Sequence, residues 1–522
     1  MRRGRFFLHL FQLETYKFDR YGEWLADNIW STVLRPSHAA GATVLGLGAA
    51  SLSVLEPTWV AVGALLLWTG AFISSRRYRS DQEKKPLAFT ERMTRLAVTT
   101  GVLTALPVLL GGLGWWSTGT AGGALWYLLG FWFADLGAPL WVALGAALMQ
   151  PVENYIQNGF KRQARRHLRE RPDLTVVGVT GSYGKTSTKF ILAELLRQKY
   201  NVYATPSSYN TPMGMCLAIN EHLKPQHQVL VLEYGIRYPG DMAELCDIAE
   251  PDVSVVTTIG VAHLDTMGSQ DAIAEEKGLL VERTSPDGAT VLNADDDRVR
   301  AMANRTDAPV WRVSVDENAD LTAHNVRYDT QGTAFEVRDD TGTEVTIRTQ
   351  LLGAHNVLNV LLGLAVGRRM GLRLRQMAHA ARRIEPIEHR LQLRHEGNLT
   401  VIDDAFNSNP VGARNAVEIL GQMDGGRRVI VTPGMVEMGD RQWEENKTLG
   451  RHIARHDIDL AVLVGDEQTA AIREGLAEAG YPSDRVKVVA SLYDAQDFLA
   501  AQLNSGDVVL YENDLPDQYE AP

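Results

Sequence analysis

A glycine- and hydroxyl-rich stretch at residues 180–187 has the residue types that hold a nucleotide phosphate. Its glycines let backbone N–H groups turn toward a phosphate, Lys185 adds a positive charge, and the Thr186 hydroxyl can bind magnesium. The spacing departs from the strict phosphate-loop pattern because the outer glycine is Gly178 and Val179 follows it. We predict a phosphate loop, and the alternative is an ordinary turn between a strand and a helix. The stretch reads Thr180-Gly181-Ser182-Tyr183-Gly184-Lys185-Thr186-Ser187.

A carboxylate follows at the end of a second apolar run, Val229–Glu233. Open α/β sheets bind their ligands outside the carboxyl ends of the strands, where Glu233 would lie. A carboxylate oxygen is also a preferred ligand of magnesium. Glu233 therefore offers a hard oxygen ligand where such a sheet binds its ligands, and the alternative is a buried glutamate paired with Arg237.

The elements around these residues predict a parallel sheet. From Asp173 onward, short β-rich runs alternate with helical stretches, as in βαβ units. The run Leu174–Val179 is the predicted strand before the loop, and Thr188–Gln198 is the predicted helix after it. The last third predicts a small Rossmann-like domain without a G-x-G-x-x-G motif. Its predicted strands are Arg428–Thr432, Leu460–Val464, Val486–Val489 and Val508–Tyr511, and its predicted helices lie near 444–455, 467–479 and 493–503.

Seven sequence blocks in a fixed order resemble the Mur ligases, a family that uses ATP to join amino acids or peptides to cell-wall precursors. The resemblance covers about residues 171–522, and the block Gly434–Gly439 looks most like the D-alanyl-D-alanine-adding branch. The seven blocks are the phosphate loop, Val229–Gly235, Gly260–Asp265, Lys277, Gly353–Asn359, His389-Arg390 and Ile402–Pro410.

This resemblance implies an ATP- and magnesium-dependent ligase that forms an amide bond through an acyl phosphate. It implies catalytic roles for Lys185, Lys277 and His263, with Lys277 carried as an anionic carbamate. It also implies that the C-terminal domain closes over the central domain at a hinge near Arg390–Leu393. The implied metal ligands are Thr186, Glu233, His263 and Lys277, and the implied nucleotide contacts are Thr180, Gly181, Ser182, Gly184, Lys185, Thr186, Ser187, Asn356, Asn359, Arg390 and Asp404.

Each of these roles has a structural alternative. His263 could be a hydrogen-bonded loop residue, and Lys277 could be a solvated lysine on a charged helix face. Asn356 and Asn359, which would read the adenine, could instead cap a helix. The remaining two residues, Arg390 near the nucleotide and Asp404 near the ribose, could form surface ion pairs.

Composition divides the chain of 522 residues into two halves. Residues 1–170 hold 18 Lys and Arg against 11 Asp and Glu, a net charge of +7, which leaves 34 against 52, or −18, for residues 171–522. The total of −11 does not fit a nucleic-acid binder, which would show a basic face. Two cysteines, Cys216 and Cys246, cannot build a disulfide framework or a four-cysteine zinc site.

Four apolar runs predict an α-helical membrane domain in the first half. Each run approaches the ~20 residues that a helix needs to cross a bilayer. The fourth run contains Asp135 and Pro139, so it could be tilted, kinked or divided into two elements. Buried helices of a soluble protein are the alternative. The runs are Ala39–Leu55, Trp59–Ser75, Leu96–Trp116 and Gly123–Met149.

Charge placement predicts the orientation of this domain. Lys and Arg are concentrated before the first run, between the second and third, and after the fourth, whereas the two other loops have none. Because cytoplasmic loops carry the excess of Lys and Arg, both termini should be cytoplasmic. We therefore predict a multi-pass protein of the bacterial cytoplasmic membrane, with its catalytic domains on the cytoplasmic side.

The expected organisation is a membrane domain at 1–170, a central α/β phosphate-loop domain at 171–393 and a C-terminal α/β domain at 394–522. In soluble members of the family, a domain that binds the uridine nucleotide precedes the phosphate loop, and here the membrane segment takes its place. The acceptor could therefore be a lipid-linked precursor or a growing anionic amino-acid polymer. The partners expected are a cell-wall precursor, an amino acid or dipeptide, and membrane lipid, with no nucleic acid. From another class, the chain could be a nucleotide-binding membrane scaffold.

Overall fold

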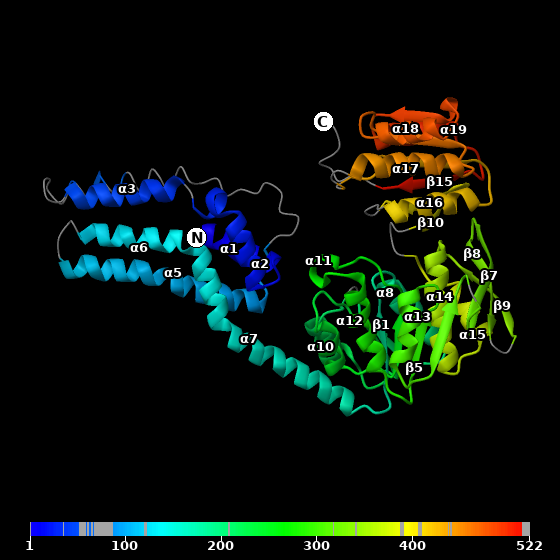
Figure 1. The fold of residues 1–522 in the computed structure, drawn as a ribbon, viewed down its shortest axis with the longest axis horizontal. Coiled ribbons are helices and arrows are strands. Elements are labelled where there is room, and N and C mark those ends of the chain that lie inside the picture. The colour runs from blue at the N-terminus through cyan, green and yellow to red at the C-terminus, as the bar shows by residue number, and fades with distance from the viewer. Residues whose placement is uncertain are drawn as a thin grey trace. The chain divides into compact units, whose positions relative to one another are not determined.

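The computed structural model describes residues 2–34, 36–51, 59, 62–63, 66, 87–118, 123–206, 209–316, 318–339, 342–386, 391–405, 410–436, 438 and 441–513. The chain divides into two compact units, Met1–Gly159 and Phe160–Pro522, and each is described by itself (Figure 1).

The first unit is helical. Phe7 and Phe11 of α1, Tyr21 of α2, Met93 of α5 and Val142 of α7 form a small buried core. Away from that core, α6 lies between α3 and α5 (Figure 1). The described helices are α1 (Arg2–Leu13), α2 (Phe18–Asp27), a π-helix (Ile29–Val33), α3 (Pro36–Ser51), α5 (Glu91–Thr118), α6 (Ala124–Leu136) and α7 (Ala138–Arg169), whose last turns belong to the second unit.

The described part of this unit contains one helix that is long and apolar enough to cross a membrane, α5, which holds the third predicted run. The fourth run is two helices, α6 and α7, which bend by 69° at their break and would count as one further span if taken together. The first run is described only as far as Ser51, and most of Trp59–Ser75 lies outside the described residues. One or two apolar helices do not support four crossings, so the multi-pass membrane domain remains a proposal.

A nine-stranded sheet is the centre of the second unit. Its order is β2-β3-β1-β4-β5-β6-β7-β8-β9; the first seven strands in this order are parallel, and β8 and β9 continue it antiparallel. The strands are β1 (Thr175–Thr180), β2 (Val202–Ala204), β3 (Val229–Glu233), β4 (Val253–Val256), β5 (Ala289–Asn293), β6 (Val310–Ser314), β7 (Leu321–Asp329), β8 (Gly332–Asp339) and β9 (Glu344–Thr349).

Helices cover both faces of the parallel part of this sheet. Val177 and Val179 of β1 pack with α8 and α14, whereas Val176 packs with α10 and α12 on the other face. Burial on both faces explains why the strands are continuous β-branched runs. The helices are α8 (Lys185–Leu196), α9 (Pro212–Leu217), a π-helix (Ala218–His222), α10 (Asp241–Ile248), α11 (Leu264–Met267), α12 (Gln270–Glu282), α13 (Asp297–Ala301), a 3₁₀ helix (Met302–Arg305), α14 (Ala354–Arg369) and α15 (Leu374–Ala381).

A second sheet of six strands, in the order β10-β11-β15-β12-β13-β14, forms the C-terminal domain. Only β10 is antiparallel to its neighbour, and the other pairs are parallel. The elements are β10 (Gln392–Glu396), β11 (Leu399–Asp404), α16 (Pro410–Gln422), β12 (Arg428–Thr432), α17 (Gln442–Arg455), β13 (Leu460–Val464), α18 (Ala470–Glu478), a 3₁₀ helix (Ser483–Arg485), β14 (Val486–Val489), α19 (Leu492–Gln502) and β15 (Val508–Glu512).

Candidate active site

The phosphate loop is the turn between β1 and α8. Gly181 and Gly184 have φ angles of 147° and 78°, which L side chains rarely adopt. A Cβ atom on Gly181 would also overlap the Thr257 hydroxyl, so glycine is required there. Helix α8 begins at Lys185, three residues before the predicted start, so residues 185–187 form its first turn. The N–H groups of a first turn have no partner within the helix and favour an anion.

Two hydrogen bonds hold the loop against the neighbouring strand ends. The Thr180 hydroxyl donates to the Tyr234 carbonyl at 2.9 Å, and the Ser182 N–H donates to the Thr258 carbonyl at 2.7 Å. Thr180 is fully buried, so its side chain fixes the shape of the loop and leaves phosphate contact to the backbone.

Two lysines meet at one carbonyl of this loop. Lys185 Nζ and Lys277 Nζ lie 2.8 Å and 2.9 Å from the Gly181 carbonyl oxygen. Burial lowers the pKa of Lys185, and nearby Glu233 opposes this effect. Lys277 reaches the loop from α12 and is 1 % exposed, so the alternative of a solvated helix-face lysine is wrong.

Lys277 is chemically distinct from an ordinary lysine. Burial, and secondly the charge of Lys185, lower its pKa to about 7, although Glu276 acts in the opposite direction. Glu276 itself accepts the N–H groups of Gly240 and Met242 at 3.0 Å and 2.8 Å. A substantial share of Lys277 is therefore a neutral, nucleophilic amine at neutral pH.

Glu233 lies at the end of β3 and is almost fully buried. One carboxylate oxygen accepts the Thr186 hydroxyl at 2.9 Å, and the other accepts the Asn210 amide at 3.2 Å. The cation paired with it is Lys189, at 3.6 Å, and the predicted alternative partner was Arg237. Sequence reasoning missed Lys189, although its place four residues after Lys185 on one helix put it on the same face.

His263 is the N-cap residue that precedes α11, and its φ of 69° lies in the left-handed region. Burial lowers its pKa, and the positive charges of Lys277 and Lys185 lower it further. These causes keep the imidazole neutral, with one nitrogen lone pair available to a metal. His263 is therefore close enough to both loop lysines for their charges to act on it.

A pocket of about 950 Å³ opens beside the loop and reaches the C-terminal domain. Its volume lies at the upper end of the ~300–1,000 Å³ range of small-molecule sites. The predicted site residues that it brings together are Gly184 and Ser187 of the loop, Asn356 and Asn359 of α14, and Asp404 of β11.

The two asparagines form a chain of hydrogen bonds from α14 to Thr188 of α8, the residue that follows the loop. Asn359 accepts the Thr188 hydroxyl at 3.0 Å and donates to the Asn356 side chain at 3.3 Å, and Asn356 donates to the Leu352 carbonyl at 2.8 Å. The residue that caps α14 is Gly353, so the helix-capping alternative is not supported. Asn359 is nearly buried and supports the loop, whereas Asn356 is the more accessible amide.

Asp404 ends β11 and accepts the Leu391 N–H at 3.0 Å. It also lines the wall of the pocket. Arg390, the predicted nucleotide-contacting arginine and the first residue of the predicted hinge, lies outside the described residues.

The sequence matches two domain families: the Mur ligase middle domain at residues 179–367 and the Mur ligase, glutamate ligase domain at residues 389–511. The UDP-N-acetylmuramoyl-tripeptide–D-alanyl-D-alanine ligase of Mycobacterium tuberculosis is 36 % identical over 356 residues, 65 % of this chain and 70 % of that protein. The ligase of the same name from Bacillus subtilis is 27 % identical over 388 residues, 73 % of this chain and 82 % of that protein.

Solved structures show the same similarity. MurF from Thermotoga maritima, in complex with ADP, has a TM-score of 0.57 at 27 % identity and covers 68 % of this chain and 80 % of its own. MurF from Acinetobacter baumannii has a TM-score of 0.59 at 25 % identity, with coverage of 68 % and 78 %.

The fold and the pocket define an ATP-dependent ligase of the α/β phosphate-loop type. The chain belongs to the Mur ligase family, whose middle and C-terminal domains it contains, and it forms amide bonds in the synthesis of peptidoglycan precursors.

Proposed function

We propose that the enzyme joins a D-alanyl-D-alanine-type dipeptide to the terminal carboxylate of a UDP-linked muramoyl tripeptide. ATP phosphorylates the carboxylate and leaves as ADP; the amine then displaces phosphate, and an amide bond forms. Relatives at 27–36 % identity are named for this reaction. The observation that carries the proposal is the pocket that gathers the loop, both asparagines and Asp404 from two domains.

Magnesium (Mg2+) fits the residues beside the loop. The Thr186 hydroxyl and the Glu233 carboxylate are oxygen donors already in contact, and His263 offers a neutral imidazole nitrogen. In the proposal these three residues hold magnesium, which neutralises phosphate charge. Lys185 contributes a fixed positive charge at the same place.

Lys277 is proposed to carry a carbamate. A neutral amine adds carbon dioxide and loses a proton, so the depressed pKa of Lys277 favours this modification at neutral pH. The product is an anion in place of one of two neighbouring cations. It therefore relieves the repulsion with Lys185 and adds an oxygen ligand for magnesium.

Phosphate release from ATP tests the whole proposal. Release by the purified enzyme should require magnesium, the UDP-linked tripeptide and the dipeptide together, and mass spectrometry should detect the amide product. Release without the dipeptide, or no release with all components, would contradict it.

A lipid-linked acceptor is the second candidate, and the first unit favours it. Helices α5, α6 and α7 expose large apolar side chains, which suits a membrane anchor at residues 1–170. In this arrangement the ligase domains, at 171–393 and 394–522, lie at the cytoplasmic face of the bacterial membrane. Confinement there would raise the effective concentration of a lipid-linked precursor.

The two acceptors can be compared directly with the full-length enzyme in lipid nanodiscs. If the lipid-linked acceptor is used more efficiently than the soluble UDP-linked tripeptide at equal concentration, the second candidate holds. A preference for the soluble tripeptide would leave the first unit as an anchor only.

A further inference from the structure

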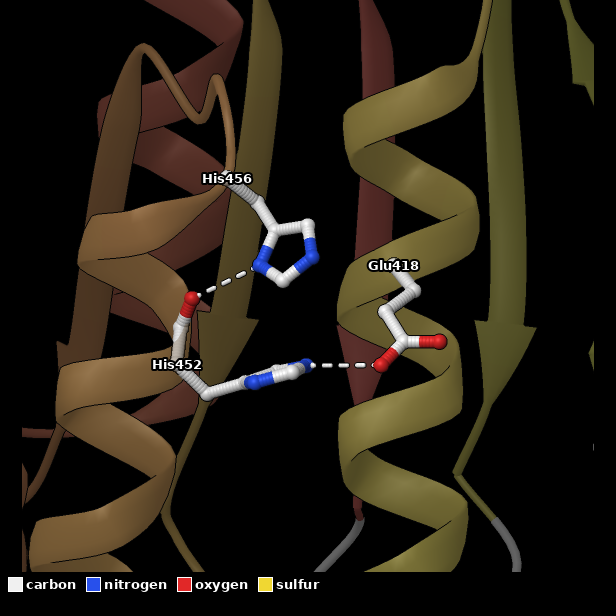
Figure 2. A group of neighbouring side chains, drawn as sticks. All are labelled: Glu418, His452 and His456. Carbon is white, nitrogen blue, oxygen red and sulfur yellow. Dashed lines mark hydrogen bonds and ion pairs between the residues drawn. The ribbon is translucent and has the colours of Figure 1, made fainter.

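The C-terminal domain contains a group of metal-binding side chains that the ligation reaction does not use. Glu418 projects from α16, and His452 and His456 lie one turn apart at the end of α17 (Figure 2). One potential ligand atom from each residue lies within 4.8 Å of the others. This is the one such group of His, Cys, Asp and Glu among the described residues.

The hydrogen bonding of His456 prepares it to bind a metal. Its Nδ1 lies 2.8 Å from the His452 carbonyl oxygen, an acceptor, so Nδ1 carries the proton. The lone pair is then on Nε2, the nitrogen on the side of the ring that faces Glu418 (Figure 2). Metal-binding histidines commonly donate their second N–H to a backbone carbonyl in this way, which fixes both the tautomer and the ring orientation.

His452 and Glu418 lie close enough that one metal ion could bind both side chains. His452 Nε2 lies 3.3 Å from Glu418 Oε1 and 3.2 Å from the Arg414 carbonyl oxygen. Because both neighbours accept hydrogen bonds, this nitrogen carries a proton directed between them. A divalent metal that replaces the proton would bind both the imidazole and the carboxylate.

The two helices hold the ligands close together. A Cβ atom on Gly421 would lie 3.0 Å from His456 Cβ, so α16 and the end of α17 are in tight contact at this point. Glu418 is 45 % exposed, which leaves a path for an ion and room for a water ligand. Two imidazoles and a carboxylate, with one open position, form a ligand set typical of zinc.

We propose that Glu418, His452 and His456 form a site for a divalent transition metal with the ligand preference of Zn2+, completed by water. The ion would connect α16 to α17. Asn415, one turn before Glu418 on α16, lines the nucleotide pocket, so the ion would also fix the helix that forms that wall. Magnesium is a poor occupant because it prefers oxygen ligands, and two of the three ligands in this group are imidazole nitrogens.

Metal binding by the full-length enzyme tests the site without reference to ligation. Protein stripped with a chelator is titrated with Zn2+ in the presence of excess Mg2+ and a competing chelator, and bound zinc is counted. We expect one more zinc ion per chain in the wild type than in His452→Gln/His456→Gln. The control His222→Gln/His395→Gln, which removes two exposed histidines, should match the wild type.

A second variant, Glu418→Gln, tests the metal site even if the double variant unfolds. Glu418→Gln retains both imidazoles and the shape of the carboxylate, and should weaken zinc about 10-fold or more. Co2+ bound to the wild type should show the visible absorption of tetrahedral coordination, and Glu418→Gln should lose it. Equal zinc counts and affinities in the wild type and Glu418→Gln, or no tetrahedral Co2+ spectrum in the wild type, would overturn the proposal.

Discussion

The two units of the molecule place apolar residues in opposite ways. In the second unit many large apolar side chains, such as Leu192 and Leu361, are fully buried against the sheet. In the first unit, Leu110 of α5 is 66 % exposed and Trp116 is 83 % exposed. A water-soluble surface rarely carries so many neighbouring apolar side chains, so the first unit is suited to lipid or to a partner.

Both units bury some charged side chains, such as Glu153 in the first unit. The buried Lys189, Glu233 and Lys277 of the second unit differ in that they lie together beside the phosphate loop, although lysine and glutamate are seldom fully buried unless they are paired. The comparison is consistent with the proposal that the second unit holds the chemistry and that the first unit determines where the chemistry takes place. The predictions that follow test this division, in order of decreasing effect on ligation.

Lys185→Ala should have the largest effect. The variant loses the charge that we propose faces the transferred phosphate, so turnover should fall by about 10²–10³-fold or more. Phosphate release measures it, and Lys224→Ala, an exposed lysine in the same unit, is the control. Membrane association should be unchanged in both variants. Wild-type turnover in Lys185→Ala would remove the phosphate loop from the mechanism.

Glu233→Gln should reduce turnover by about 100-fold, with partial recovery at high magnesium, because an amide is a weaker ligand than a carboxylate. It also removes the carboxylate that forms an ion pair with the buried Lys189, which should lower the free energy of unfolding by about 3–5 kcal/mol. Adding Lys189→Met removes that buried charge. The double variant should regain stability without regaining activity, as measured by urea unfolding and phosphate release.

The stability and the activity of the double variant separate the structural role of Glu233 from its role as a magnesium ligand. If the double variant recovers neither property, the carboxylate supports the fold through contacts other than Lys189. If it recovers both, Glu233 is a structural ion-pair partner and does not bind magnesium.

Lys277 should make ligation sensitive to pH near neutrality. Its pKa is about 7, so the neutral amine that a carbamate requires falls from about one half of the molecules at pH 7 to about one eleventh at pH 6. Activity should therefore fall by about five-fold between pH 7 and pH 6 at fixed bicarbonate. Lys277→Ala should be inactive, and short carboxylic acids should partly restore it. Full activity in this variant would refute the carbamate.

The pH dependence of the free energy of unfolding gives an independent measure of the pKa of Lys277. The folded state binds Lys277's proton only below about pH 7, whereas an ordinary lysine holds it up to about 10.5. Between these values the unfolded chain binds more protons, so this group makes the folded state more stable as pH rises. Between pH 7 and 9, the unmodified wild type should gain about 2 kcal/mol relative to Lys277→Met in urea unfolding without carbon dioxide. If the free energy of unfolding changes equally with pH in both proteins, the pKa of the Lys277 amine is not lowered in the folded state.

The sequence predicts the strands of the second unit well because burial on both faces makes them continuous β-branched runs. The predicted ranges for β3, β12, β13 and β14 agree with the structure. Strand β7 and the two strands that continue the sheet antiparallel, β8 and β9, were not predicted, since alternating polar residues there weaken the apolar pattern. The start of α8 was placed late because its first turn belongs to the loop motif.

The sequence did not predict that charged residues of the site are buried. Lys189 and Lys277 stand on helices among polar neighbours, where a lysine normally faces water. Only the packing of α8 and α12 against the sheet encloses them. The group of Glu418, His452 and His456 was missed for a similar reason, since its two helices are joined by tertiary contact alone.

The last prediction concerns the first unit and should leave ligation unchanged. Leu106, Leu109 and Leu113 lie on one exposed face of α5. If this face contacts lipid, each change to Lys should cost about 2.5–3.5 kcal/mol of insertion free energy. The triple variant should leave the membrane fraction in vesicle flotation, whereas turnover of a soluble acceptor should remain within about two-fold of wild type, because no catalytic residue lies in this unit.

Charge alone could release the protein from a membrane surface, so the control must add lysines elsewhere. Trp443→Lys/Tyr493→Lys replaces two exposed aromatic residues of the second unit. It should float with the vesicles like the wild type, because those side chains lie on the ligase domains. If the control and the α5 variant float equally, α5 does not contact lipid, and its apolar face must be covered by protein. If the wild type itself stays out of the vesicle fraction, the membrane interpretation of the first unit is wrong.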